Sequence, residues 1–227
     1  RRPSGNSCAM SEKRPRSSRT ERLADRAAIL AGLVSALVAA PALVVLAVRL
    51  GAGAHALAAV SVYAVTLLGM FAASAAYHLV EDSGLANLFR RADRAAIYAK
   101  VAGTYTPFAV LLGGERAFAI LVGMWSAAAV GIALALLAPR RFESLGLALY
   151  VAMGWSILVV GWPILTAMQP ATLALFASGG ALYSAGVGVF VWRGLGLRNA
   201  IWHTIVFVAT GLIYAAIAIE LLAARAP

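Results

Sequence analysis

The chain has 227 residues, of which 62% are apolar and 12% are charged, and its mean hydropathy is +0.86. This composition excludes disordered, collagen-like and disulfide-scaffold proteins, and it argues against a soluble globule, which is typically about 45–50% apolar and 25% charged. The net charge of +10 alone would suit a nucleic-acid partner, so the position of the charges decides its meaning.

Residues 1–26 hold eight of the 19 Lys and Arg residues and few large apolar side chains. Such a segment cannot bury enough surface to offset its ordering entropy, so we predict a basic, disordered cytoplasmic tail and no nucleic-acid partner. Met10, which precedes a charged run, is a candidate for the true start of translation. The single cysteine, Cys8, lies in this tail, so we expect no intrachain disulfide and no cysteine metal site.

From Ala27 onward the chain divides into apolar runs of about 18–25 residues, each long enough to cross about 30 Å of hydrocarbon as a helix. We predict an all-α membrane protein, a seven-transmembrane helix bundle over residues 27–222, followed by a short outer tail over 223–227. The connections are too short for a second domain. The predicted helices cover residues 27–47, 55–79, 95–112, 117–138, 145–168, 171–192 and 199–222.

The distribution of Lys and Arg predicts the orientation of this bundle. With the amino terminus inside, 15 of the 19 cations fall in the tail and the inner connections, and three fall on the outer side. We therefore predict a cytoplasmic amino terminus and an outer carboxyl terminus. This is the reverse of a G-protein-coupled receptor, so a receptor of that class is disfavoured.

Polar side chains are costly inside a membrane, at about 2.5–3.5 kcal/mol for a central charge, and four fall near the predicted inner face: His78, Asp93, Asn199 and His203. Ser74 and His78 are four residues apart, as are Asn199 and His203, so each pair shares a helix face. Two such donors on one helix and a third from another can build a tetrahedral zinc site with an open position for water, which a carboxylate would orient or deprotonate. Taken singly, each histidine is better explained by hydrogen bonds to headgroups or to a neighbouring helix.

Lys100 follows Asp93 by seven residues, on the same helix face and roughly 10 Å deeper. It would pair inside the bundle with a lipid headgroup or a carboxylate, or it would snorkel to the inner interface or pair with a neighbouring helix. We favour the second interpretation, because long basic side chains near helix ends commonly behave in this way.

Six short motifs follow one another along the predicted membrane part. They are Ser74-Ala-Ala-Tyr77-His78, Asp93-Arg-Ala-Ala-Ile97-Tyr98, Ala102-Gly-Thr-Tyr-Thr-Pro-Phe108, Tyr150-Val-Ala-Met-Gly-Trp155, Gly179-Gly180-Ala-Leu-Tyr183 with Gly186, and Ile201-Trp202-His203. Together they resemble the hemolysin III group of the progestin and adipoQ receptor superfamily, over residues 20–222. The resemblance implies a seven-helix bundle with its amino terminus inside, in a bacterial inner (plasma) membrane.

The resemblance also implies a zinc ion near the inner face. In the adiponectin-receptor relatives three histidines hold it, one on the second helix and a His-x-x-x-His pair on the seventh, with a water close to a Ser and an Asp. The metal ligands would correspond to His78, His203 and the position of Asn199, and the catalytic pair to Asp93 and Ser74. Asn199 stands where the family has a histidine, and an amide oxygen is a weaker zinc ligand than imidazole. Three alternatives follow. The site would bind zinc through His78, His203 and Asp93, or it would bind a different or more weakly held metal. Otherwise it would be empty, and the polar residues would form a hydrogen-bonded lock between three helices.

Two classes of function remain from the sequence. One is a zinc-dependent, ceramidase-like hydrolase of lipid amides or esters that enter from the inner leaflet. The other is a non-catalytic membrane protein, either a regulator or receptor of membrane or lipid state or an oligomeric pore-forming cytolysin. A pore ranks last, because the predicted helices lack polar stripes. In each case the expected partners are membrane lipids.

Overall fold

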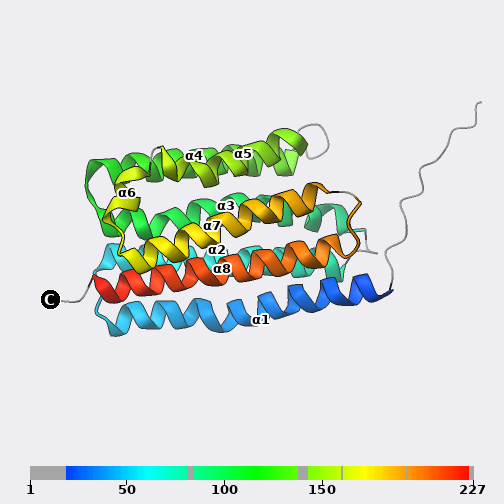
Figure 1. Cartoon of the computed structure of the whole chain (residues 1–227), viewed down its shortest axis with the longest axis horizontal. Coiled ribbons are helices and arrows are strands. Elements are labelled where there is room, and N and C mark those ends of the chain that lie inside the picture. Colours follow the sequence, from blue (N-terminus) through cyan, green and yellow to red (C-terminus); the bar gives the residue numbers. More distant parts are fainter. Residues whose placement is uncertain (1–18, 81–83, 138–142, 160, 193, 225–227) are drawn as a thin grey trace, which may run out of the picture.

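The computed structural model describes residues 19–80, 84–137, 143–159, 161–192 and 194–224, and the regular structure within them is entirely helical. The helices lie side by side with their long axes in one direction (Figure 1). Their bounds are α1 Arg19–Arg49, α2 Ala54–Leu79, α3 Ala86–Leu112, α4 Gly114–Leu137, α5 Glu143–Trp155, the 3₁₀ turn η1 Ser156–Leu158, α6 Trp162–Ala167, α7 Pro170–Val191 and α8 Arg198–Ala223.

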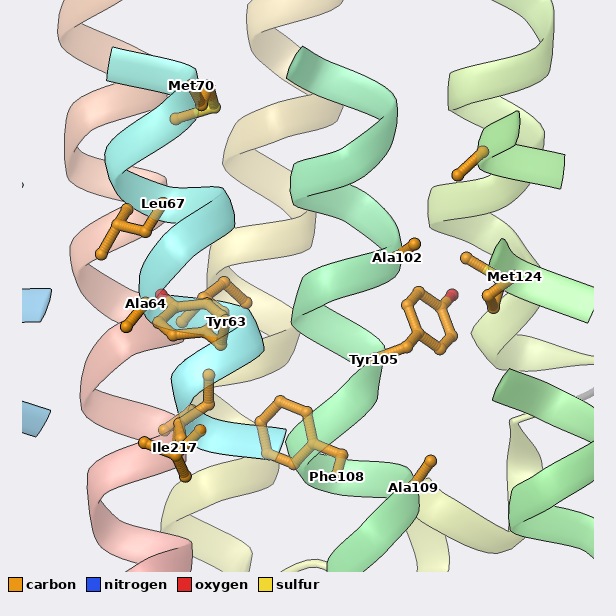
Figure 2. Close-up of a cluster of buried hydrophobic side chains, with 14 of the residues drawn as sticks. Tyr63, Ala64, Leu67, Met70, Ala102, Tyr105, Phe108, Ala109, Met124 and Ile217 are labelled. Carbon is orange, nitrogen blue, oxygen red and sulfur yellow. The ribbon is translucent and has the colours of Figure 1, made fainter. Parts of the chain in front are cut away.

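The contacts between helices place α2 and α3 at the centre of the fold. The closest neighbours are α2 with α3, α7 with α8, α3 with α4, and α1 with both α2 and α8. Apolar and aromatic side chains of α2 and α3, among them Tyr63, Leu67 and Phe108, form the core between these two helices (Figure 2). The starts of α1, α3 and α8 and the end of α2 lie at the same end of the bundle, opposite the carboxyl terminus (Figure 1). We call this the site end.

Among the described residues, five helices are long and apolar enough to cross a membrane: α1, α2, α4 from Arg116, α7 and α8. The chain is therefore a multi-pass membrane protein. The sequence predicted seven crossing helices. α3 is not among the five helices that are apolar enough. Its first turns carry Arg90, Arg91, Asp93 and Arg94, and Lys100 follows in the middle of the helix.

Two helices begin earlier than predicted. α1 starts at Arg19 and α3 at Ala86, whereas the expected starts were residues 27 and 95. Residues 19–26, which we had expected in the disordered tail, form the first turns of α1. Both predicted starts were placed where charged residues give way to an apolar run, but a helix with one inward face continues through charged turns when the other faces meet solvent or headgroups. The remainder of the tail, with Cys8 and Met10, lies outside the described residues.

The predicted helix over 145–168 is interrupted, and side chains satisfy the backbone at the break. The chain passes from α5 through η1 to α6, with Pro163 in the first turn of α6, where a missing N–H costs nothing. The Tyr105 hydroxyl of α3 donates to the Met153 carbonyl at 2.8 Å, and the Ser156 hydroxyl donates to the same oxygen at 2.7 Å. Unpaired carbonyls are costly in lipid, so these bonds stabilise the break.

Replacing Tyr105 with phenylalanine is expected to lower stability by about 1–2 kcal/mol, because the buried Met153 carbonyl loses a hydrogen-bond donor. The midpoint of thermal unfolding in detergent micelles, followed by helical circular dichroism, would report the loss. An unchanged midpoint would mean that the Ser156 bond alone satisfies this carbonyl.

Candidate metal centre

Asp25, His78 and His203 meet at the site end from three different helices. Asp25 lies near the start of α1, His78 in the last turn of α2 and His203 near the start of α8. Asp25 faces inward because it continues the buried stripe of α1, whose members are Asp25, Ile29, Gly32, Ala36, Ala40, Leu43 and Ala47. This spacing of three and four residues is one helix face. The carboxyl is thus carried into the bundle by the packing of the helix.

The Asp25 carboxylate lies between the two imidazoles. Its Oδ1 is 2.6 Å from His203 Nδ1, and its Oδ2 is 3.1 Å from His78 Nδ1. The two rings are perpendicular, with centroids 5.1 Å apart. One potential ligand atom from each of the three residues lies within 4.8 Å of the others. Each oxygen of the carboxylate therefore has its own imidazole partner.

This donor set is suited to a divalent metal. Two histidines and one carboxylate, with a fourth position open, form a common type of catalytic zinc site. Tetrahedral ligands about 2.0–2.2 Å from zinc stand about 3.3–3.6 Å from one another, so the carboxylate would need to withdraw by about 1 Å or less. The three residues could therefore hold a metal ion once their side chains adjust to these distances. Without an ion, the same residues form a hydrogen-bonded lock between α1, α2 and α8.

Asp93 and Ser74 adjoin this group. The Asp93 carboxyl on α3 accepts a hydrogen bond from the Ser74 hydroxyl and lies close enough to both histidines to interact with them electrostatically. Ser74 is buried one turn before His78 on the same face of α2. A second carboxyl group is thereby positioned beside the candidate ligands, with a hydroxyl group to orient it.

The structure brings together four of the residues singled out from the sequence, namely Ser74, His78, Asp93 and His203. Asn199 is exposed in the first turn of α8, and its role as a ligand stays a prediction. Asp25 is the member that the sequence analysis missed. Asp25 lies four residues before Ile29 and so continues the apolar face of the first helix. This spacing identifies Asp25 only if the first helix is predicted to begin before residue 27.

Lys100 lies away from this group and does not reach the bundle end. It is 3% exposed, its Nζ donates to Thr104 Oγ1 at 2.8 Å, and the ammonium lies over the Tyr63 ring of α2, 4.4 Å from the centroid. The favoured interpretation was that Lys100 snorkels to the inner interface or pairs with a neighbouring helix. In the structure Lys100 contacts the neighbouring helix α2 and does not snorkel.

Comparison with known proteins places this site in a family context. The model of haemolysin-III related proteins matches residues 26–216. Hemolysin-3 of Bacillus cereus is 31% identical over 184 residues, which cover 80% of this chain and 84% of that protein. A hemolysin-3 homolog of Bacillus subtilis strain 168 is 29% identical over 149 residues, which cover 64% of this chain and 69% of that protein. The matched region includes His78, Asp93 and His203 and begins one residue after Asp25.

Proposed function

The chain belongs to the haemolysin-III related family and is a multi-pass protein of a bacterial membrane, and we propose that it is a metal-dependent hydrolase of lipid amides or esters. The observation that carries the proposal is the convergence of Asp25, His78 and His203 with a second carboxyl group, that of Asp93, beside them. Zinc is the metal we propose, because two histidines and one carboxylate are a ligand set of catalytic zinc sites.

The proposal includes a seven-crossing topology with the site end at the inner face of the membrane. α3 packs between α2 and α4 and runs alongside them, so it would cross with them despite its charged start (Figure 1). The α5, η1 and α6 segments would together make a further, broken crossing. Arginines cluster near the site end in α3 and α8, at Arg90, Arg91, Arg94 and Arg198, as cytoplasmic ends favour.

Asp25 would compensate for Asn199, whose amide oxygen is a weaker zinc ligand than the histidine that the resemblance implies. A site reduced to His78, His203 and an amide would bind zinc weakly, whereas a carboxylate is an ordinary zinc ligand. In this chain Asp25 would supply the third ligand from α1, and Asp93 would remain free for proton transfer. A carboxylate from another helix would thus take the place of the histidine that the resemblance implies at position 199.

The chemistry would be hydrolysis of an acyl C–N or C–O bond. The ion would polarise the carbonyl and lower the pKa of a water molecule. Asp93 would accept the proton of the attacking water and return it to the leaving amine or alcohol, while the Ser74 hydroxyl holds the carboxyl in position. A lipid is the natural substrate class, because a site at the end of a membrane bundle lies near the depth at which lipid amide and ester groups meet headgroups.

The test compares purified, zinc-loaded protein with its Asp93→Asn variant. Ceramides, acylated amines and phospholipids are supplied in micelles, and fatty-acid release is followed. We expect Asp93→Asn to lower the rate about 100-fold or more while the bound zinc is kept, because a positioned acid-base group contributes about 10²–10⁴-fold. Ser74→Ala should retain more activity, since it acts through Asp93.

Glu220→Gln is the matched control, because Glu220 lies at the opposite end of α8 and accepts a bond from the Gln169 backbone at 3.4 Å. Its rate should equal that of the unaltered protein. The hydrolase proposal fails if none of the three lipid classes is cleaved, or if Asp93→Asn cleaves them equally well.

A non-catalytic role is the second candidate, supported by the direct bonds from Asp25 to both histidines. The same residues would then lock α1, α2 and α8 in one arrangement that responds to lipid state. The name of the Bacillus cereus relative, hemolysin-3, adds a cytolytic variant of this candidate. Release of a trapped dye from vesicles, without lipid cleavage, would favour that variant.

A further inference from the structure

A second polar group lies deeper in the bundle than the candidate metal centre and takes no part in it. Lys100 of α3 is 3% exposed and Tyr63 of α2 is 0% exposed. Lys100 follows Asp93 by two helical turns, and Tyr63 precedes His78 by about four, so both lie toward the opposite end of the bundle. This pair is built from buried side chains in the centre of the core (Figure 2 shows Tyr63).

The two side chains offer more hydrogen-bond donors than the protein accepts. An ammonium group has three donors and no acceptor. One of them bonds to Thr104 Oγ1, and the Tyr63 ring face lies on another side of Nζ. The Tyr63 hydroxyl is buried and, among the described residues, has no hydrogen-bond partner. The Tyr63 hydroxyl therefore lacks a partner, and the ammonium keeps donors beyond its bond to Thr104, in the same part of the core.

A negatively charged acceptor would also stabilise the ammonium form of Lys100. Within the part of the chain that the structure describes, Lys100 has no carboxylate partner, and a buried cation left uncompensated costs several kcal/mol. A water molecule would satisfy hydrogen bonds but would leave the charge in place. A monoanion would satisfy both requirements.

Neighbouring hydroxyl groups enlarge the set of donors. Tyr183 and Tyr214 are close enough to Tyr63 to interact with it electrostatically, and the Tyr183 hydroxyl is bonded to Thr210 Oγ1. Two hydroxyl groups joined by one bond keep one proton to donate elsewhere. Hydrogen-bond donors of α2, α3, α7 and α8 thus lie in this part of the core.

We propose that Lys100 and Tyr63 form a binding site for a monoanion inside the bundle, separate from the candidate metal centre. The Lys100 ammonium supplies the charge, and the Tyr63 hydroxyl supplies a second hydrogen bond. The ligand is a halide ion from solution or the carboxylate head of a membrane amphiphile, since both present one negative charge to two donors. Binding at this site does not require the hydrolase function.

The sequence makes a direct test practical, because the chain has only two lysines, Lys13 and Lys100. In a Lys13→Arg protein labelled with ¹⁵N-lysine, the side-chain signal belongs to Lys100 alone. The protein in lipid nanodiscs is titrated with sodium bromide at constant ionic strength, and separately with dodecanoate against dodecanol as the uncharged match. We expect a saturable shift of the Lys100 signal with bromide if the ligand is a free ion, and with dodecanoate alone if it is an amphiphile head.

Two variants make the result specific to this pair. Tyr63→Phe keeps the ring under the ammonium but removes the hydroxyl, and it should weaken the apparent affinity about tenfold. Tyr105→Phe removes a buried hydroxyl on the other side of α3, where Tyr105 points toward Met124 (Figure 2), and it should leave the affinity unchanged. In Lys100→Met, which removes the buried charge, the anion should no longer raise the midpoint of thermal unfolding.

The proposal is overturned by the absence of a saturable shift with both anions, or by equal affinity in the Tyr63→Phe protein. A thermal midpoint that still rises with the anion in Lys100→Met would also overturn it, because binding would then lie elsewhere.

Discussion

Replacing Asp25 with alanine is expected to reduce bound zinc from about one ion per chain to a trace. Asp25 is the residue that touches both histidines, at 2.6 Å and 3.1 Å, and its loss leaves two imidazoles from different helices as the only members of the candidate ligand set. Structural and catalytic zinc sites need at least three protein ligands. Elemental analysis of protein purified after zinc supplementation measures the effect.

Asn199→Ala is the matched control, since the two substitutions separate the candidate ligand that lies beside the histidines in the structure from the one implied by the resemblance. Asn199 is exposed, so this variant should keep its zinc. If Asn199→Ala loses zinc and Asp25→Ala keeps it, the ligand set proposed here is wrong. If the unaltered protein holds only trace zinc after supplementation, the three residues are a hydrogen-bonded lock.

Replacing Gly131 with alanine is expected to destabilise the bundle by about 1–3 kcal/mol, the usual cost of overpacking a core. A Cβ atom at this position of α4 would stand 2.3 Å from Cδ1 of Tyr98 on α3. Tyr98 cannot withdraw easily, because it is buried, its ring meets Tyr150 edge-on, and its hydroxyl lies 2.7 Å from the position that a Cβ of Gly146 would take. The ring is therefore held in a slot between α4 and α5.

Gly123→Ala on the same helix provides the comparison. A Cβ there meets nothing within 4 Å, so this substitution should leave stability unchanged or raise it slightly through helix propensity. Thermal unfolding of both variants in one detergent, followed by circular dichroism, gives the difference. Equal midpoints would show that α3 and α4 can separate to admit a methyl group.

Much of the helical framework was predictable from apolar run length alone. The helices α2, α7 and α8 begin and end within one residue of the expected positions, because their boundaries coincide with polar or glycine-bearing connections. The broken segment from α5 to α6 was not predictable in this way. Its apolar run is continuous in the sequence, and the bonds from Tyr105 and Ser156 that stabilise the break join residues about 50 positions apart or lie within the break itself.

Run length and composition were enough to predict a helical membrane protein with His78, Asp93 and His203 near one end of it. Charged and polar residues are costly in a membrane and are few in these apolar runs, so each one is a candidate functional residue. The tertiary structure decided which residues complete the group. Asp25 reaches His78 and His203 only because α1 begins eight residues before its apolar run and packs against α2 and α8, and Lys100 stays in the core because its side chain extends toward Thr104 and Tyr63. Contacts between helices distant in the chain depend on packing, which the pattern along any single helix does not contain.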